Sequence, residues 1–203
     1  MKAKIFSAIL FIVCALSVPA ASSEKSQNLP KAALIQKMQQ GGLVLYIRHA
    51  STEKDYADQV TADVNDGSTQ RVLSEKGWHE AVGIGAAFRS HQIPYAKVVT
   101  SEYFRAWQTA WLAFGQYEKN PALNFLPYEE YTDEQVLEMK NRVTPLLTQI
   151  PPEGKNSVIV AHDDPFEAAT GIYPEPQGVT YVLKPATDGT FTVLGHINPD
   201  DWK

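Results

Sequence analysis

The chain has 203 residues, with 18 basic and 23 acidic side chains, a formal net charge of −5 and a single cysteine. An acidic balance argues against nucleic acid or an anionic membrane as a partner. The cysteine, Cys14, lies in the expected leader described next. The mature chain therefore has no thiol for a disulfide, a cysteine nucleophile, an iron–sulfur cluster or a cysteine zinc site.

Residues 1–21 have the pattern of a secretory signal peptide. Lys2 and Lys4 form a basic start, residues 5–16 are mostly apolar, and residues 18–20 (Val-Pro-Ala) supply the small residues of a cleavage site. Neither this stretch nor any later one is long enough to span a bilayer. We expect a periplasmic or secreted protein whose residues 22–203 form one domain. Removal of the signal peptide takes away Lys2 and Lys4 and changes the formal net charge of the protein from −5 to −7.

Strand and helix patterns alternate along the mature chain. Continuous apolar runs, typical of strands buried on both faces, occupy residues 43–47, 97–100 and 157–161, and further strands are expected at 124–126, 179–183 and 191–194. Start and stop signals delimit helices at 30–40, 74–91 and 101–114, and a capping box at 132–135 begins another. The alternation predicts a three-layer α/β/α fold with a mainly parallel sheet.

The sequence also predicts how several side chains within these helices pack. Pro145 should kink or divide the last helix. Small residues of the helix at 74–91 should pack against the sheet. Its apolar stripe consists of Trp78, Ala81, Val82, Gly85 and Ala86, and extends to Phe88. In the next helix we expect three aromatic residues to lie in the core: Trp107, Trp111 and Phe114.

The polar connection at residues 51–71 is long for a loop, and long loops are commonly functional. Its aspartates are interpreted as a solvated face. The alternative interpretation gives part of the loop a role in substrate choice, through Lys54, Asp55, Tyr56 and Gln59.

Charged and imidazole side chains follow the predicted strands. Arg48 and His49 end the first, His162 follows the third, and Arg105 lies just after the second. Because carboxyl ends of parallel strands meet at one edge of a sheet, we expect these side chains to converge. The set suits a phosphate dianion, which Arg binds bidentately.

A neutral His49 can attack phosphorus and form a phosphohistidine. Arg48, Arg105 and a protonated His162 would then neutralise the charge on the phosphoryl oxygens. A metal site of His49, His162 and Asp163 is disfavoured, since the flanking arginines would repel a cation. We therefore expect neither a metal nor a cofactor.

Four motifs in order resemble the histidine phosphatase superfamily, the phosphoglycerate mutase-like fold. Residues 48–52, Arg-His-Ala-Ser-Thr, resemble its Arg-His-Gly-Glu-Thr/Ser motif, and residues 73–77 resemble its Leu-(Ser/Thr)-x-x-Gly helix start. Residues 101–110 match its Ser-x-x-x-Arg-Ala-x-Gln-Thr-Ala segment, and residues 158–162 match the strand that ends in its second histidine.

The resemblance implies a role for each matching residue. His49 would be the phosphorylated nucleophile, Arg48 and Arg105 would bind the phosphoryl group, and His162 would complete the pocket. Thr52 matches the family's hydroxyl residue near the phosphate. Two positions could supply the general acid. In the acid phosphatase branch it follows the second histidine, which corresponds to Asp163; in the mutase-like branch it is a glutamate, which corresponds to Glu129 or its neighbour Glu130. We prefer Asp163 because it adjoins His162.

Two departures from the family pattern leave rival functions open. Ala50 replaces a glycine, and Asp163 with Asp164 replaces the common glycine after the second histidine. They motivate a catalytically inactive phosphate-sugar binding protein as the alternative to a phosphatase, and a phosphomutase is the nearest enzymatic rival. The Arg-His-Ala sequence resembles that of the exported lipopolysaccharide core heptose phosphate phosphatases, which implies a small phosphosugar as substrate.

Overall fold

The computed structural model describes residues 26–202 except Tyr56, Thr61 and Glu129. The expected signal peptide therefore lies outside the described residues. In the described part a six-stranded sheet has the order β3-β2-β4-β1-β5-β6. Its strands are β1 (Val44–Arg48), β2 (Tyr95–Thr100), β3 (Glu118–Lys119), β4 (Asn156–Ala161), β5 (Thr180–Pro185) and β6 (Phe191–Ile197).

Strands β3, β2, β4 and β1 run parallel to one another, whereas β5 pairs antiparallel with β1 and with β6. The sheet is thus mainly parallel with an antiparallel edge, as expected of many α/β folds. The helices are α1 (Lys31–Gln40), α2 (Glu75–Ser90), α3 (Phe104–Phe114), α4 (Asp133–Leu147) and α5 (Asp163–Thr170), with 3-10 turns η1 (Gly67–Thr69), η2 (Pro121–Leu123) and η3 (Pro199–Trp202).

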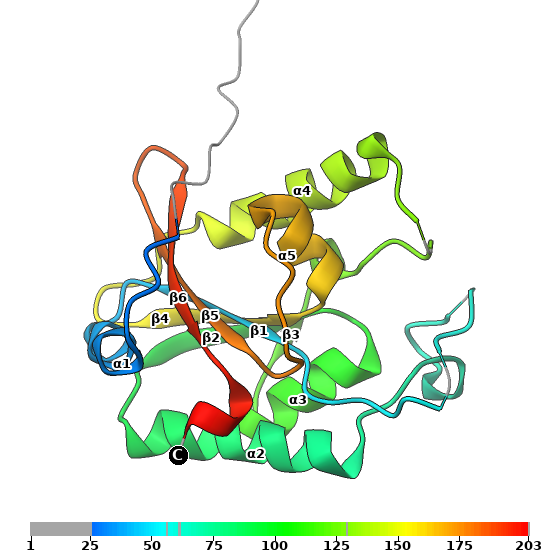
Figure 1. Ribbon diagram of the computed structural model, residues 1–203, viewed down its shortest axis with the longest axis horizontal. Coiled ribbons are helices and arrows are strands. Elements are labelled where there is room, and N and C mark those ends of the chain that lie inside the picture. The colour runs from blue at the N-terminus through cyan, green and yellow to red at the C-terminus, as the bar shows by residue number, and fades with distance from the viewer. Residues whose placement is uncertain (1–25, 56, 61, 129, 203) are drawn as a thin grey trace, which may run out of the picture.

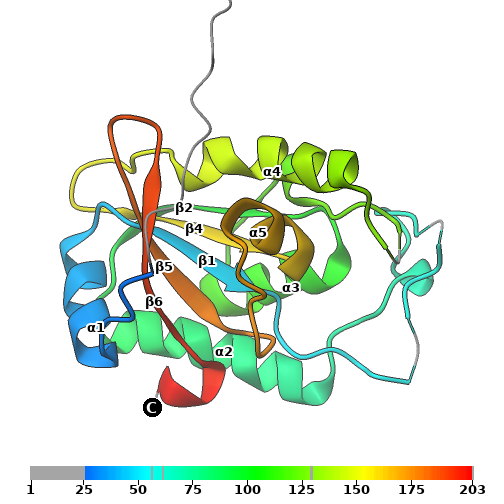
Figure 2. The same ribbon diagram turned by 45° about the horizontal axis from the view of Figure 1, so that its top comes forward.

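Helices cover both faces of the sheet. Figures 1 and 2 show α2 and α3 on one side and α4 and α5 on the other. Successive residues of β1 point to opposite faces, so Leu45 and Ile47 belong to the core beneath α1 and α2, while Val44 and Tyr46 belong to the core beneath α4 and α5. The predicted three-layer α/β/α architecture is confirmed.

Parallel pairing aligns the ends of three strands at one edge of the sheet. Arg48 is opposite Ala161 in the register of β1 and β4. Beyond it, the His49 amide donates to the Ala161 carbonyl at 2.9 Å, and the Ser101 amide, just after β2, donates to Val160 at 3.1 Å. The backbone thus brings the residues after β1, β2 and β4 together.

Two sequence-based elements differ in the structure. Residues 124–126 are not a strand; the short β3 lies at Glu118–Lys119 instead. The backbone of Asn124 bonds to the Pro121 carbonyl and to Arg142 instead of to a strand, and its side chain accepts hydrogen bonds from Ser101 Oγ at 2.8 Å and the Glu102 amide at 3.0 Å. The same bonds hold 101 and 102 out of the helix, so α3 begins at Phe104.

The predicted apolar faces of α2 and α3 were partly wrong. Trp78 and Trp111 are each 54% exposed and Val82 is 48% exposed. The face of α2 that packs is turned toward Ile84 and Phe88. A Cβ on Gly85 would lie 2.0 Å from the carbonyl oxygen of Ala113, so this glycine permits close packing on α3, not on the sheet.

Helix α4 continues through Pro145 and is not divided. The proline lies in the last turn, two residues before the helix ends at Leu147, and leaves the carbonyl of residue 141 without its amide partner in the helix. No helix within the described residues is long and apolar enough to cross a membrane.

Candidate active site

His49 is a buried imidazole in a single defined tautomer. Its Nδ1 lies 2.9 Å from the carbonyl oxygen of Ala50, which can only accept, so Nδ1 carries the proton. Its Nε2 accepts from Nε–H of Arg105 at 3.2 Å. Burial, and then the charge of Arg105, lower the pKa of His49 well below its ordinary value of 6.5. The ring is therefore neutral at pH 7, with its lone pair at Nε2.

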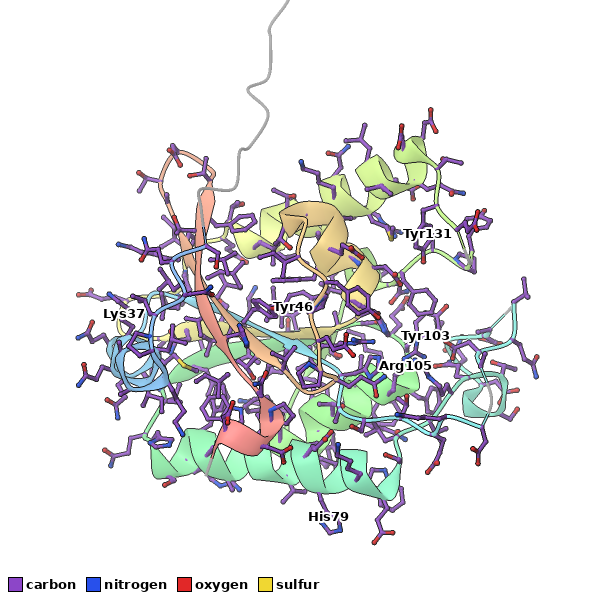
Figure 3. All side chains as sticks on the ribbon, in the orientation of Figure 1. Lys37, Tyr46, His79, Tyr103, Arg105 and Tyr131 are labelled. Carbon is purple, nitrogen blue, oxygen red and sulfur yellow. The ribbon has the colours of Figure 1, made fainter. Side chains whose placement is uncertain are left out.

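Arg105 comes from the first turn of α3 and is 3% exposed. Its guanidinium carbon lies 5.2 Å from the ring centres of both Tyr103 and Phe125. Its two terminal nitrogens each approach an oxygen of Asp58 at 2.9 Å. Figure 3 shows Arg105 and Tyr103 together on the side of the molecule nearest the 51–71 loop.

Arg48 is the last residue of β1 and is also buried. Its Nη1 donates to the Pro174 carbonyl at 3.0 Å, and its Nη2 lies 2.6 Å from Oδ2 of Asp163. The guanidinium carbon stands 5.2 Å from the centre of the Tyr173 ring. Within the described residues its Nε has no hydrogen-bond partner.

His162 faces His49 across the site, with ring centres 5.5 Å apart. Its Nε2 lies 2.8 Å from Ser101 Oγ, and its buried Nδ1 has no partner among the residues that the structure describes. Burial, followed by the charges of Arg105 and His49, lowers the pKa of His162 well below 6.5. An incoming phosphate would reverse the sign of the nearby charge and favour proton uptake at Nδ1.

The segment after His49 is held by α2. The amide and carbonyl of Ser51 bond to Glu80 Oε2 at 2.8 Å and to the Ser74 amide at 3.0 Å. A Cβ on Gly77 would lie 1.9 Å from the Ser51 carbonyl oxygen. This close approach explains the glycine in the Leu-Ser-Glu-Lys-Gly stretch.

The substitution at Ala50 has little structural consequence. Ala50 does not have a positive φ, so a glycine is not needed for the backbone conformation. Its amide donates to Thr109 Oγ1 at 3.1 Å, and its methyl group belongs to a small buried cluster with Leu73 and Ala81. Alanine in place of glycine therefore does not restrict the backbone at this position.

The expected acids lie in different surroundings. Asp163 opens α5, and its Oδ2 accepts from Arg48 and from the Tyr173 hydroxyl at 2.8 Å. Asp164 is partly buried, and burial followed by repulsion from Asp163 raises its pKa to about 6. Glu129 lies outside the described residues, and its neighbour Glu130 is exposed.

Thr52 lines a cavity of about 710 Å³ that opens beside Arg48. Its amide and hydroxyl are both engaged by the Gln177 side chain, at 3.1 and 3.3 Å. The rest of the wall is mostly polar or charged: Ser51, Glu53, Lys54, Asp55, Arg71, Ser74, Lys76, Tyr173, Glu175, Pro176 and Gln177. This is the space next to Arg48 in which a polar group of a ligand can lie.

Three residues at the site had no assigned role from the sequence. Asp58 binds Arg105 from the long loop, Tyr173 binds Asp163, and Ser101 binds His162. Ser101 was at least visible as the first residue of its motif. No sequence signal marked Asp58 or Tyr173, because their partners are 47 and 10 residues away with no regular spacing.

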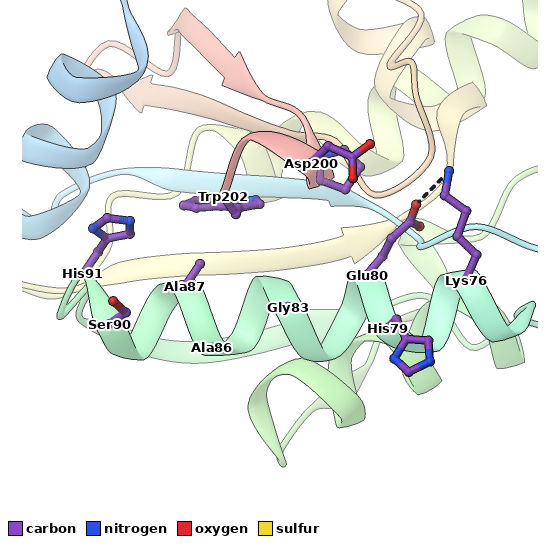
Figure 4. A pocket seen from close by; sticks show the side chains of 11 residues that line it. Lys76, His79, Glu80, Gly83, Ala86, Ala87, Ser90, His91, Asp200 and Trp202 are labelled. Atoms are coloured by element: carbon purple, nitrogen blue, oxygen red, sulfur yellow. Dashed lines mark ion pairs between the residues drawn. The ribbon is translucent and has the colours of Figure 1, made fainter.

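The other described cavities lack this convergence. A groove of about 590 Å³ between α2 and η3 contains His79 and His91, but Figure 4 shows them at opposite ends of the helix. Twelve residues of helix separate them by roughly 18 Å, so they cannot act together. Among the described residues, no group of three His, Cys, Asp or Glu side chains is arranged to hold a metal.

No protein-family model and no curated protein sequence matches the chain, but solved structures do. The protein histidine phosphatase SixA complexed with tungstate is 15% identical, with a TM-score of 0.57 over 79% of this chain and 99% of that chain. A phosphoserine phosphatase from Entamoeba histolytica in complex with phosphoserine is 13% identical, with a TM-score of 0.59 over 78% and 98%. A mycobacterial glucosyl-3-phosphoglycerate phosphatase is 17% identical, with a TM-score of 0.54 over 75% and 97%.

These neighbours are members of the histidine phosphatase superfamily, and the chain has their phosphoglycerate mutase-like α/β fold. The predicted fold class is confirmed. At this level of identity the likeness establishes the fold alone, because one fold can support many activities.

Proposed function

We propose that this protein is an exported, metal-independent phosphomonoester hydrolase that acts through a phosphohistidine on His49. The observation that carries the proposal is the state of His49, a buried neutral ring whose Nε2 lone pair lies against Arg105. A neutral imidazole nitrogen is a nucleophile. Two buried guanidiniums beside it attract the dianion that it would attack.

In the first step Arg48, Arg105 and His162 bind the non-bridging oxygens of the phosphomonoester. Nε2 of His49 attacks phosphorus, an N–P bond forms, and the bond from phosphorus to the leaving oxygen breaks. The ring becomes cationic as this happens. The hydrogen bond from Nδ1 to the Ala50 carbonyl then stabilises the added charge.

Asp163 is the proposed proton donor to the leaving oxygen, with Glu129 as the alternative. When the substrate phosphate replaces Asp163 as the partner of Arg48, Asp163 takes up a proton from solvent and donates it to the leaving oxygen. In the second step water attacks phosphorus, an O–P bond forms, the N–P bond breaks, and the Asp163 carboxylate accepts the proton that the water loses. Inorganic phosphate leaves, the electron pair has returned to Nε2 of His49, and Asp163 releases its proton to solvent as it pairs with Arg48 again.

The cavity beside Arg48 supports a small phosphosugar as substrate. Its wall offers hydroxyl, amide and charged side chains, including Ser51, Thr52 and Gln177. Such groups bind a polyhydroxylated leaving group better than an apolar one. The wall carries charges of both signs: the basic residues Lys54 and Lys76 and the acidic residues Glu53 and Asp55.

Trapping of the phosphoenzyme tests the reaction. The mature protein is mixed with a ³²P-labelled phosphomonoester and quenched in alkaline detergent, because the N–P bond is labile in acid. Label on the wild type and on His79→Ala, but not on His49→Ala, is expected, together with release of inorganic phosphate. Binding without label or phosphate release would indicate the inactive binding protein, and transfer of label to a second acceptor instead of water would indicate a mutase.

The proton donor is tested by two variants. Asp163→Asn should lower kcat by about 10²–10⁴-fold, the usual contribution of a general acid, and Glu129→Gln should have a smaller effect. A substrate with a good leaving group, such as 4-nitrophenyl phosphate, should restore most of the rate in Asp163→Asn. The reverse order of effects would assign the acid to Glu129.

Export is tested with the full-length chain produced in a Gram-negative host. Cell fractionation and amino-terminal sequencing should find a periplasmic protein that begins at Ala21 or Ser22. A cytoplasmic, uncleaved product would contradict this part of the proposal.

A further inference from the structure

The ion pair that joins Asp58 to Arg105 has no part in the proposed reaction. Nη1 of Arg105 donates to Oδ1 at 2.9 Å, and Nη2 lies 2.9 Å from Oδ2. The Arg71 amide adds a third hydrogen bond to Oδ1 at 2.7 Å. Parallel two-pronged contact of this kind is how arginine binds carboxylates and phosphates alike.

Other contacts already position both partners. Arg105 is held by its Nε contact to His49 and by the rings of Tyr103 and Phe125. The loop that carries Asp58 has its own cross-links, which include Gln59 amide to Thr69 carbonyl at 3.0 Å and Gln70 Nε2 to Asp63 carbonyl at 2.6 Å. The pair with Asp58 is therefore only one of several contacts that hold the arginine, and the bond from the Arg71 amide to Asp58 is only one of several that close the loop.

Arg105 cannot offer the same two nitrogens to Asp58 and to a phosphoryl group. We propose that Asp58 is an internal competitor of phosphate, which occupies the Arg105 fork and leaves it each time the substrate binds. The inference rests on the proposed function. A tethered carboxylate competes at an effective concentration in the millimolar range or above, whereas a phosphate dianion displaces it through its greater charge.

This competition has a consequence for turnover. After hydrolysis, inorganic phosphate is bound by the same two arginines that bound the substrate. The return of Asp58 to Arg105 removes that arginine from the phosphate and favours release of the product. Asp58 therefore weakens the binding of substrate and product together and favours product release, which limits the rate of many enzymes.

Isothermal titration with inorganic phosphate, at fixed pH and ionic strength, tests the idea without depending on catalysis. Asp58→Asn keeps the side-chain shape but loses the charge, and it should bind phosphate about ten- to a hundredfold more tightly than the wild type. Asp63→Asn is the matched control, because it removes one charge from the same loop and keeps the oxygen that bonds the Asn65 amide. Its affinity should stay within about twofold of the wild type, since an exposed charge is screened by salt.

Kinetics provide the second measurement. Asp58→Asn should lower KM, kcat and the inhibition constant of phosphate together, as tighter product binding requires. Phosphate affinity equal to or weaker than that of the wild type, in a variant with an unchanged melting temperature, would overturn the inference. A tungstate complex of the wild type in which both Asp58–Arg105 contacts persist would overturn it as well.

The outcomes separate this inference from the proposed function. Tighter phosphate binding by Asp58→Asn without any hydrolysis or labelled His49 would support the competitor and reject the phosphatase. Hydrolysis by the wild type with unaltered phosphate binding in Asp58→Asn would do the opposite. A lack of phosphate binding by both proteins would reject both.

Discussion

Arg105 donates its Nε–H to Nε2 of His49 across 3.2 Å, so a buried cation rests against the nitrogen that would attack phosphorus. A protonated Nε2 could not accept this bond. The contact, together with burial, keeps the ring neutral, and the Ala50 carbonyl selects the tautomer with the proton on Nδ1. The pair makes the nucleophile available and places a phosphate ligand beside it.

This arrangement predicts the protonation state of His49. Its lowered pKa means that the ring gains a second proton only at pH values well below 6.5. Long-range ¹H–¹⁵N NMR of the imidazole should show the Nδ1–H tautomer, unchanged between pH 6.5 and 8. Protonation of His49 within that interval would contradict the prediction.

The planar guanidinium of Arg105 should contribute to activity through its geometry as well as through its charge. Arg105→Lys keeps one positive charge but loses the planar, two-pronged donor set, and kcat/KM should fall by about 10²–10³-fold. Arg89→Lys, on the exposed side of α2, is the control and should keep nearly full activity. Equal activity of the two variants would show that Arg105 acts only as a point charge or not at all.

Two glycines of α2 provide a matched pair for stability. Gly77→Ala places a Cβ 1.9 Å from the Ser51 carbonyl oxygen and should destabilise the fold by about 3 kcal/mol. Gly83 has no atom within 4 Å of such a Cβ, and Gly83→Ala should stabilise by about 0.5–1 kcal/mol. Urea denaturation measures both changes, and a neutral Gly77→Ala would refute the packing argument.

Asp164 should make stability depend on pH in a defined direction. Its folded-state pKa, about 6, is above the ordinary value of 3.8. The folded form therefore binds a proton more tightly than the unfolded form, so this group's contribution is fully present below pH 3.8 and is lost as pH rises through 6.

Asp164→Asn cannot ionise, so it avoids the loss of folding stability that ionisation of Asp164 causes at higher pH. The variant should be more stable than the wild type by about 1–2 kcal/mol at pH 8, a value reduced for the partial exposure of the group, and the gain should shrink toward pH 4. Thermal or urea unfolding at both pH values measures the difference. A gain that does not depend on pH would assign the effect to packing or to the Tyr131 contact instead.

The amino-acid sequence by itself determined the central strands and the residues at their ends. Apolar runs without alternation mark β1 and β4, and each run stops at His49 or His162. Because parallel strands end at one edge of a sheet, these local patterns were enough to predict that the imidazoles and Arg105 meet. The capping signals of Ser74 and Thr132 likewise depend only on near neighbours, and both caps form.

Only the tertiary structure decided which groups complete the site. Whether an aspartate of a polar loop faces water or Arg105 depends on contacts between segments 47 residues apart, which no periodicity records. Asp58, expected on a solvated face, instead forms the ion pair on which the competitor inference rests. The exposure of Trp78 and Trp111 has the same origin, because composition reports that a side chain is apolar but its partners decide whether it is buried.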